Sequence, residues 1–259
     1  MDNTNAQAVL DDPEIQQAIL DGIFRTYINP EIERRQKAGN LESPFELIAA
    51  LVVLSPDGSE CEVRLNSEVS FHATPIYKPG VLVTPDAPVF AGDLEGIEGI
   101  QLMDSDDPDS GYIVLLLLNG VWHLKFDFRR NKCFAGQLLD VAKQFHEAAG
   151  FSLEKRHLNA CLDNLFSAAE LSAKAYLIQT RFDLLKSRKH SAVQTFFNME
   201  ASLDNIPPEH CDVLNQLRKL RNPARYLERD LIISEQDAQH FFDVVRDMID
   251  TTLNGLGNS

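Results

Sequence analysis

The chain has 259 residues, of which 44% are hydrophobic and 24% charged, a composition typical of a globular protein with one large or two ordinary domains. Its net charge of −15 makes it a poor candidate for non-specific binding to duplex DNA. No apolar run approaches the ~20 residues that span a bilayer, and the chain does not start like a signal peptide, so we expect a cytoplasmic protein without membrane association.

The charge is unevenly distributed along the sequence. Residues 1–130 carry 9 Lys and Arg against 22 Asp and Glu, a net charge of −13, whereas residues 131–259 carry 15 against 17 and are nearly neutral. Physiological salt screens charges beyond about 8 Å, so a local group of cations can still hold a phosphate in an acidic protein. An anion site is therefore expected in the second half.

The first segment has the pattern of a helix. Asp11-Asp12-Pro13 is a typical helix start, with a proline near the first helical position and carboxylates close to the positive end of the helix dipole. Apolar residues then recur at helical spacing: Ile15, Ala18, Ile19, Ile23 and Phe24. Asn29-Pro30 predicts a second, short helix that ends near Gly39.

Between about Phe45 and Phe128 the pattern changes to that of strands. A turn signal over 56–58 follows an apolar run and precedes an alternating one, which predicts a hairpin. Asn119-Gly120 lies between two further apolar runs and is the strongest short signal for a second hairpin. The expected strands of this antiparallel sheet cover residues 47–54, 61–65, 80–84, 112–118 and 121–128.

After residue 131 the sequence becomes helical, and each expected helix has one apolar and one polar face. These helices cover about 133–150, 154–182, 188–201, 209–222 and 235–253, with breaks at Gly150, Pro207-Pro208 and Pro223. The fold class is therefore predicted as α+β: an N-terminal helix and antiparallel sheet over 1–131, followed by an all-α bundle over 132–254.

Metal and redox sites are not favoured by the sequence. The four cysteines form no CxxC pair, and we expect four small buried thiols: Cys61, Cys133, Cys161 and Cys211. The acidic segment 104–110 lacks a suitably spaced glutamate for calcium and is better explained as a solvated loop. No metal and no cofactor is therefore predicted.

A basic segment, Leu217–Tyr226, contrasts with the acidic chain, because it contains Arg218, Lys219, Arg221 and Arg225. It holds a polyanion, a phosphate or the carboxylates of a partner, or it solvates the end of a helix. A proline disrupts a helix interior, so we expect a new turn to start at Pro223, with Arg221 and Asn222 at the junction. If Pro223 only kinks the helix, one face carries Arg218, Arg221 or Asn222, Arg225 and Arg229.

A second polar pair, Glu170 and Lys174, lies four residues apart on an expected helix, in the favourable acid-first order. The simpler interpretation is an exposed ion pair worth a few tenths of a kcal/mol. The functional interpretation makes both residues part of a site on the face of the bundle.

Three stretches of the helical half resemble the HEPN domain family. Residues 163–175 are similar to a family helix rich in small residues with Glu, Leu, Lys and Ala, 187–193 to the stretch before its next helix, and Leu217–Tyr226 to its basic segment. Together they span about 135–253. The resemblance implies a helical bundle that dimerises, and either a metal-independent ribonuclease or a non-catalytic binder of nucleotides or RNA.

The active members of that family have an Arg followed four to six residues later by a His. Arg221 matches that Arg, but Tyr226 stands where the His is expected. A tyrosine with its ordinary pKa of about 10 is a poor proton shuttle at neutral pH. His190 from another helix is an alternative proton-transfer group.

We therefore expect a non-catalytic, homodimeric protein that binds a nucleotide or single-stranded RNA, in a stress, defence or toxin–antitoxin context implied by the resemblance. The expected ligand-binding residues are Arg218, Arg221, Asn222, Arg225, Tyr226, His190, Glu170 and Lys174. One alternative is a protein–protein interaction module, in which the arginines pair with the acidic half of the chain or an acidic partner. The other is a metal-independent ribonuclease.

Overall fold

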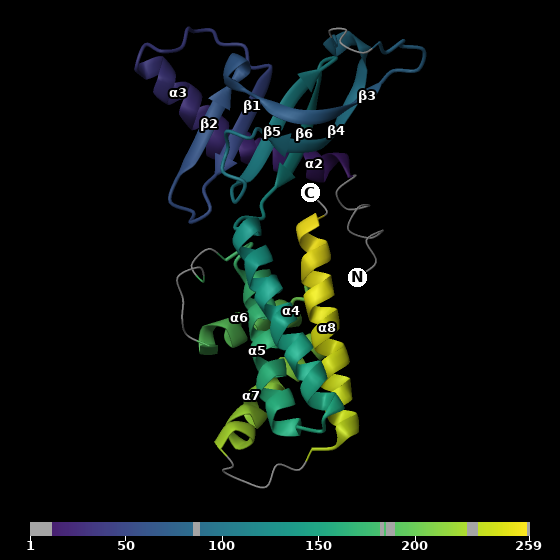
Figure 1. Ribbon diagram of the computed structural model, residues 1–259. Coiled ribbons are helices and arrows are strands. Elements are labelled where there is room, and N and C mark those ends of the chain that lie inside the picture. Colours follow the sequence, from purple (N-terminus) through teal and green to yellow (C-terminus); the bar gives the residue numbers. More distant parts are fainter. Residues whose placement is uncertain (1–11, 85–88, 182–183, 185–189, 227–232, 258–259) are drawn as a thin grey trace. The chain divides into compact units, whose positions relative to one another are not determined.

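The computed structural model describes residues 12–84, 89–181, 184, 190–226 and 233–257 (Figure 1). Between Phe128 and Arg129 the chain divides into two compact units. The N-terminal unit contains helices and antiparallel strands, and the C-terminal unit is helical, so the predicted α+β fold class is confirmed.

The first described element of the N-terminal unit is helix α2, Pro13–Ile23, which is followed by a π-helical turn, Phe24–Ile28, and helix α3, Asn29–Lys37. The Asp12 carboxylate accepts a hydrogen bond from the backbone N–H of Glu14 at 2.9 Å, which caps the start of α2. The two predicted helices therefore follow each other through a single wide turn.

Four strands form an antiparallel sheet in the order β2-β1-β5-β6. The strands are β1, Ala49–Leu54, β2, Cys61–Leu65, β5, Gly111–Leu118, and β6, Val121–Asp127. Both predicted hairpins, β1–β2 and β5–β6, are confirmed by the register. Asn119 and Gly120 have φ angles of 51° and 79°, as a tight two-residue turn between twisted strands requires.

A second, two-stranded sheet was not predicted. It pairs β3, Phe71–Tyr77, with β4, Leu94–Leu102, and is flanked by short 3-10 turns at Asn66–Glu68 and Ala91–Asp93. The predicted strand over 80–84 is wrong: residues 81–84 have no regular structure, and Leu82 is 94% exposed. This apolar segment finds no burial in the sheet.

The central strands β1 and β5 are covered on both faces. One face packs with residues of α2 and α3 around Ile23, Ile28 and Leu115, and the other packs on the second sheet around Val114 and Ile97. This two-sided burial explains why β1 is an unbroken apolar run instead of an alternating one.

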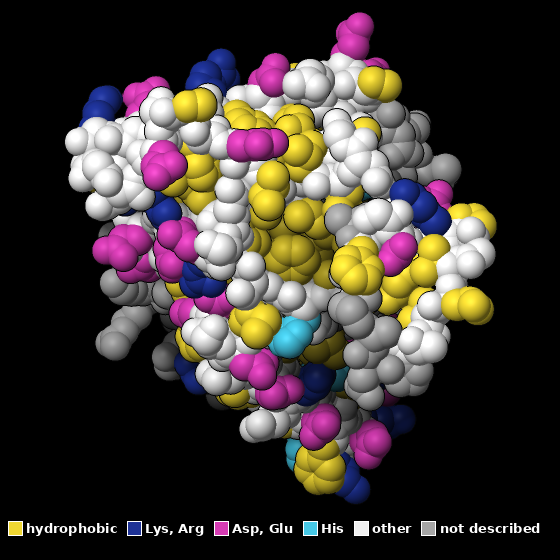
Figure 2. Space-filling view, turned by 90° about the horizontal axis from the view of Figure 1, so that it is seen from above, with side chains coloured by type: hydrophobic (Ala, Val, Ile, Leu, Met, Phe, Trp, Pro, Cys, Tyr) yellow, Lys and Arg dark blue, Asp and Glu magenta, His cyan; other side chains and the backbone are white. Residues whose placement is uncertain are grey.

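On the face seen in Figure 2, hydrophobic side chains gather in a central hollow with carboxylates around it.

The described residues of the C-terminal unit form a bundle of five helices (Figure 1). They are α4, Lys132–Glu154, α5, Leu158–Leu177, α6, His190–Ser202, α7, Pro208–Tyr226, and α8, Glu235–Gly257. The predicted break at Gly150 is wrong, because α4 continues to Glu154; the absent side chain lets the ring of Phe242 approach, and an added Cβ would lie 3.2 Å from it. The predicted helix 154–182 instead begins at Leu158.

The prediction of four buried thiols is wrong for two of them. Cys161 and Cys211 are buried inside the bundle, whereas Cys61 and Cys133 are exposed. Burial raises the pKa of the Cys161 thiol to about 11, so this residue behaves as a small apolar side chain at neutral pH.

Candidate functional site: an arginine array on α7

Helix α7 carries the basic segment without interruption. The prediction that Pro223 starts a new helix is wrong, because Pro223 lies inside α7, which continues to Tyr226. A proline removes one backbone N–H, and three residues from the helix end that loss costs less than it would in the middle. Residues three or four apart share a face, so Arg218, Arg221 and Arg225, here called the arginine array, lie along one side of α7.

Asp163 on α5 contacts two members of the array. Its Oδ1 lies 3.3 Å from Nε of Arg221, and its Oδ2 lies 3.3 Å from an Nη of Arg225. All three side chains are partly exposed, at 27%, 25% and 46% for Asp163, Arg221 and Arg225. One carboxylate therefore orders two guanidinium groups at the surface.

The aromatic ring of Phe166 packs against the guanidinium group of Arg221. The guanidinium carbon of Arg221 lies 4.6 Å from the centre of this ring, within cation–π distance. Phe166 is buried, whereas the Arg221 side chain remains 25% exposed. Arg221 is thus held by Asp163 at one edge and by Phe166 on one face.

Arg218 lies at the next position of the array, beside a small recess between α5, α6 and α7. Its side chain is exposed, and it lines this recess with Phe166, Glu170 and Gln194, among others. The recess, of about 10 Å³, is too narrow for a nucleotide base. Glu170, predicted from its spacing to Lys174, therefore does lie next to the array.

The remaining predicted residues are placed as follows. Asn222 is exposed on α7 between Arg218 and Arg225, and Lys174 is partly buried one turn beyond Glu170 on α5. Tyr226 ends α7 and His190 begins α6, but the side chains of both lie outside the described residues.

Asp163, Phe166 and Gln194 were missed as site residues. Asp163 is 58 residues from Arg221 in the sequence. The available signal was that Asp163 opens the family-like stretch, and that residues 163, 166 and 170 fall on one helix face.

Three described histidines of the bundle make side-chain contacts with other groups. His146 Nε2 lies 2.9 Å from the carbonyl oxygen of Phe242, His210 lies 2.7 Å from Asp247, and His240 lies 3.9 Å from Glu209. His157 precedes α5 and is exposed. Among the described residues, no group of three or more His, Cys, Asp or Glu side chains has the arrangement of a metal site.

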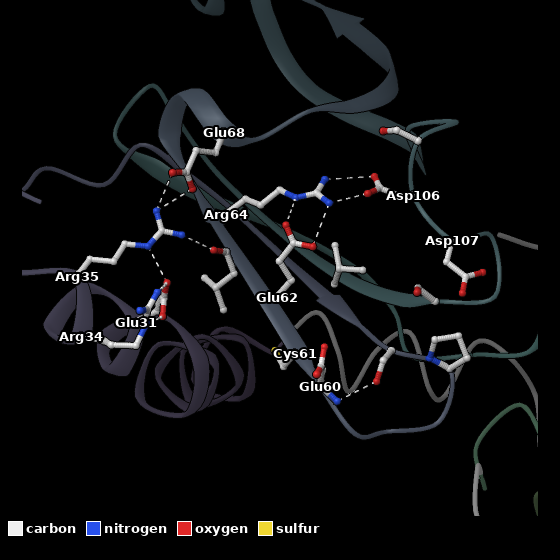
Figure 3. A pocket seen from close by; sticks show the side chains of 16 residues that line it. Glu31, Arg34, Arg35, Glu60, Cys61, Glu62, Arg64, Glu68, Asp106 and Asp107 are labelled. Carbon is white, nitrogen blue, oxygen red and sulfur yellow. Dashed lines mark hydrogen bonds and ion pairs between the residues drawn. The ribbon is translucent and has the colours of Figure 1, made fainter. Parts of the chain in front are cut away.

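The N-terminal unit has a separate polar cleft of about 1040 Å³ beside β2 (Figure 3). Arg35 donates to Glu31 and Glu68, and Arg64 donates to Glu62 and Asp106, at 2.6 to 2.7 Å for the closest contact of each pair. These four carboxylates satisfy both guanidinium groups, so we assign the cleft a structural role. Arg64 fixes one residue of the acidic loop, Asp106, whose side chain is only 4% exposed. Asp104, Ser105, Asp107 and Pro108 are exposed, as expected for a solvated loop.

Comparison with known proteins bears on the bundle. No curated protein matches the chain. Among the residues that the structure describes, none of the helices is long and apolar enough to cross a membrane. Residues 135–256 match the family model of the HEPN domain, which covers α4 to α8 and includes the arginine array. A HEPN domain implies a function related to nucleotides or RNA, and the C-terminal half of this chain, residues 135–256, belongs to the HEPN domain family.

Proposed function

We propose that the HEPN domain of this protein is a non-catalytic module that binds a phosphate-bearing ligand, single-stranded RNA or a nucleotide, at the arginine array. One observation carries the proposal: three arginines lie on one side of an uninterrupted α7, and two of them are ordered by Asp163. A pre-ordered guanidinium group loses less side-chain entropy when it binds a phosphate.

The contacts with Asp163 leave donors for a ligand. Each of the two contacts uses one nitrogen of a guanidinium group that carries five N–H donors. A phosphate can therefore accept bidentate hydrogen bonds from Arg221 or Arg225 while Asp163 still holds the opposite edge. Asn222 would add a hydrogen bond, and Tyr226 would stack on a base.

The absence of cleavage is supported by the groups around the array. Tyr226 occupies the sequence position of the catalytic histidine, and His146, His210 and His240 contact groups away from the array. These three imidazoles make their contacts elsewhere, and without an imidazole at the array proton transfer to and from the ribose would be slow. The side chain of His190, the alternative proton-transfer group, lies outside the described residues. Binding through the array does not need such a group.

The test is a gel-shift experiment with labelled single-stranded RNA in EDTA. Wild-type protein should shift the RNA without shortening it, Arg221→Ala should lose the shift, and Arg246→Ala, which removes an exposed arginine of α8, should retain it. Shortened products that disappear in Arg221→Ala would show a ribonuclease instead. If both RNA and a nucleotide such as ATP fail to bind, the proposed function is wrong.

One observation favours the alternative, a protein-interaction module. Asp163 already offsets part of the charge of Arg221 and Arg225, as an acidic group of a protein partner would. In that case RNA would not compete with the protein partner for the array, and the array would stabilise the bundle.

We also propose that the domain forms homodimers in the cytoplasm, as HEPN domains commonly do, and that it acts in stress response, defence or a toxin–antitoxin system.

A further inference from the structure

A groove lies between α2 and β6 of the N-terminal unit, far in sequence from the arginine array. Its volume is about 810 Å³, and its walls are formed by residues 13–20 of α2 and by 120–126 at and along β6. β6 is the last strand of the four-stranded sheet. The groove therefore runs beside the edge of a sheet.

Along this groove, the backbone of β6 alternates between groups that face β5 and groups that point away from it. Leu118 and Val121 flank the two-residue turn and form the first pair of the hairpin, so their N–H and C=O groups face each other. By alternation, the backbone groups of Trp122, Leu124 and Phe126 point away from β5. Within the described part of the chain, no backbone hydrogen bond reaches them from another strand or loop.

The two faces of β6 differ in chemistry at this edge. Trp122, Leu124 and Phe126 face α2, where Ile19 and Leu20 complete an apolar wall. Phe126 is 39% exposed, although it is a large aromatic side chain. A strand added to this edge would therefore place every second side chain against apolar groups.

The other set of side chains on β6 presents His123 and Lys125 to the groove, whereas Asp127 in the same set is buried. His123 and Lys125 alternate with the apolar residues, and both line the groove, whose described lining residues include no carboxylate. This is unusual in a half of the chain with a net charge of −13. The intervening side chains of an added strand would thus lie next to positive charge.

We propose that the groove between α2 and β6 binds an extended segment of a partner protein as a fifth strand of the sheet. The segment has apolar residues at one set of alternate positions, against α2, and acidic residues at the other set, next to His123 and Lys125. Backbone hydrogen bonds give the affinity of such strand addition, and the alternating side chains give its specificity.

The charge pattern argues against a second copy of this chain as the occupant. If two β6 strands paired antiparallel about Leu124, His123 of one copy would face Lys125 of the other. No opposite charges would meet across that pair. A lysine on an edge strand is also a common device against self-association, whereas a glutamate on the added strand would pair with it.

Trp122 makes this proposal directly testable, because it is the single tryptophan of the chain and lines the groove. The probe is a capped ten-residue peptide of alternating Val and Glu, titrated into the full chain while Trp122 emission is recorded. We expect a saturable change in emission. A peptide of alternating Val and Lys should bind at least several-fold more weakly, since it brings like charges together.

The charge contact is tested with matched variants. Lys125→Glu should weaken binding of the Val-Glu peptide on the order of tenfold, because attraction to neighbouring glutamates becomes repulsion. Lys37→Glu makes the same charge change at a lysine of α3 that is 80% exposed, and should leave the affinity within about twofold. Equal effects of both variants, or no response of Trp122 to millimolar peptide, would overturn the proposal.

The strand geometry is tested with two N-methylated versions of the peptide. Methylation of the valine amides should abolish binding if the added strand is antiparallel, and methylation of the glutamate amides should do so if it is parallel, because these are the amides that face β6. Undiminished binding of both versions would exclude strand addition. These outcomes do not depend on whether the arginine array binds RNA.

Discussion

Arg221 donates from Nε to Oδ1 of Asp163 across 3.3 Å and thereby joins α7 to α5 at the surface of the bundle. The same carboxylate contacts Arg225 through its second oxygen. Asp163 therefore has two effects on the arginine array: it orders two guanidinium groups, and it competes with any phosphate for them.

The first prediction separates these effects. Asp163→Asn keeps a carbonyl oxygen that can accept from Arg221 but removes the negative charge. At this partly exposed position, removing the carboxylate charge that competes with phosphate should outweigh the loss of order in the guanidinium groups. Binding of single-stranded RNA should therefore become several-fold tighter. The measurement is fluorescence polarisation with labelled RNA. Weaker binding would mean that positioning by the carboxylate dominates, and unchanged binding would mean that RNA does not contact the array.

The second prediction concerns Gly111, the first residue of the inner strand β5. A Cβ at this position would lie 2.9 Å from the carbonyl oxygen of Asp127 and 3.3 Å from backbone atoms of Phe128. Backbone atoms cannot move away cheaply, so Gly111→Ala should lower the free energy of unfolding by roughly 1–3 kcal/mol. Denaturant titration followed by Trp122 fluorescence reports on this unit.

Gly22→Ala is the matched control. Gly22 lies in α2, and an added Cβ meets nothing within 4 Å. Alanine should therefore stabilise the helix by up to about 1 kcal/mol, the opposite sign to Gly111→Ala. Equal effects at the two positions would contradict the packing derived for Gly111.

The third prediction is a pH dependence of the bundle at His146. Burial lowers the pKa of His146 below its usual 6.5, the carbonyl of Phe242 partly opposes this by hydrogen bonding, and nearby Arg246 lowers the pKa further. The unfolded chain therefore binds a proton more readily than the folded bundle. The stability due to neutral His146 is complete above about pH 6.5 and is lost as the pH falls through the lower folded-state pKa.

The measurement is the free energy of unfolding of the bundle at pH 7.5 and pH 5, from helical circular dichroism. Wild-type protein should lose stability toward pH 5, and His146→Gln, which keeps a donor near Phe242, should lose less. The account of His146 is wrong if the two proteins have the same slope over this range.

The fourth prediction concerns acid stability of the N-terminal unit. Hydrogen bonds from Arg34, and then from Arg35, lower the pKa of Glu31 from 4.5 to about 2. The ionised carboxylate then stabilises the folded unit, and this contribution is present above pH 4.5 and is lost as the pH falls toward 2. Glu31→Gln should flatten this acid transition in Trp122 fluorescence, whereas Glu33→Gln, at a side chain 64% exposed, should not.

Some of the architecture could be read from the sequence because the signals are local. Asn119-Gly120 fixes the β5–β6 hairpin, and the apolar periodicity after residue 131 specifies the helices of the bundle. β3 and β4 were missed because Pro75 and two glycines of β4 are atypical of strands. They pair only as a two-stranded sheet packed on the first.

The site was predictable only in part, because the sequence contains local signals but does not show contacts between distant segments. The arginines are contiguous in sequence, so their charge was evident, and the resemblance of 163–175 to the family pointed to the helix that faces them. Their partner Asp163 comes from another helix, and only the packing of α5 on α7 brings it within 3.3 Å. The continuity of α7 through Pro223 also depends on that packing, which sequence propensity does not contain.

The most direct test of phosphate binding by the arginine array is the salt dependence of RNA affinity. The logarithm of the association constant for single-stranded RNA should fall linearly with the logarithm of salt concentration, with a slope near −0.7 for each phosphate contact. Arg218→Ala, Arg221→Ala and Arg225→Ala should each make the slope shallower by about 0.7, and Arg246→Ala should not change it. A slope that is the same in wild type and in all three array variants would contradict the account.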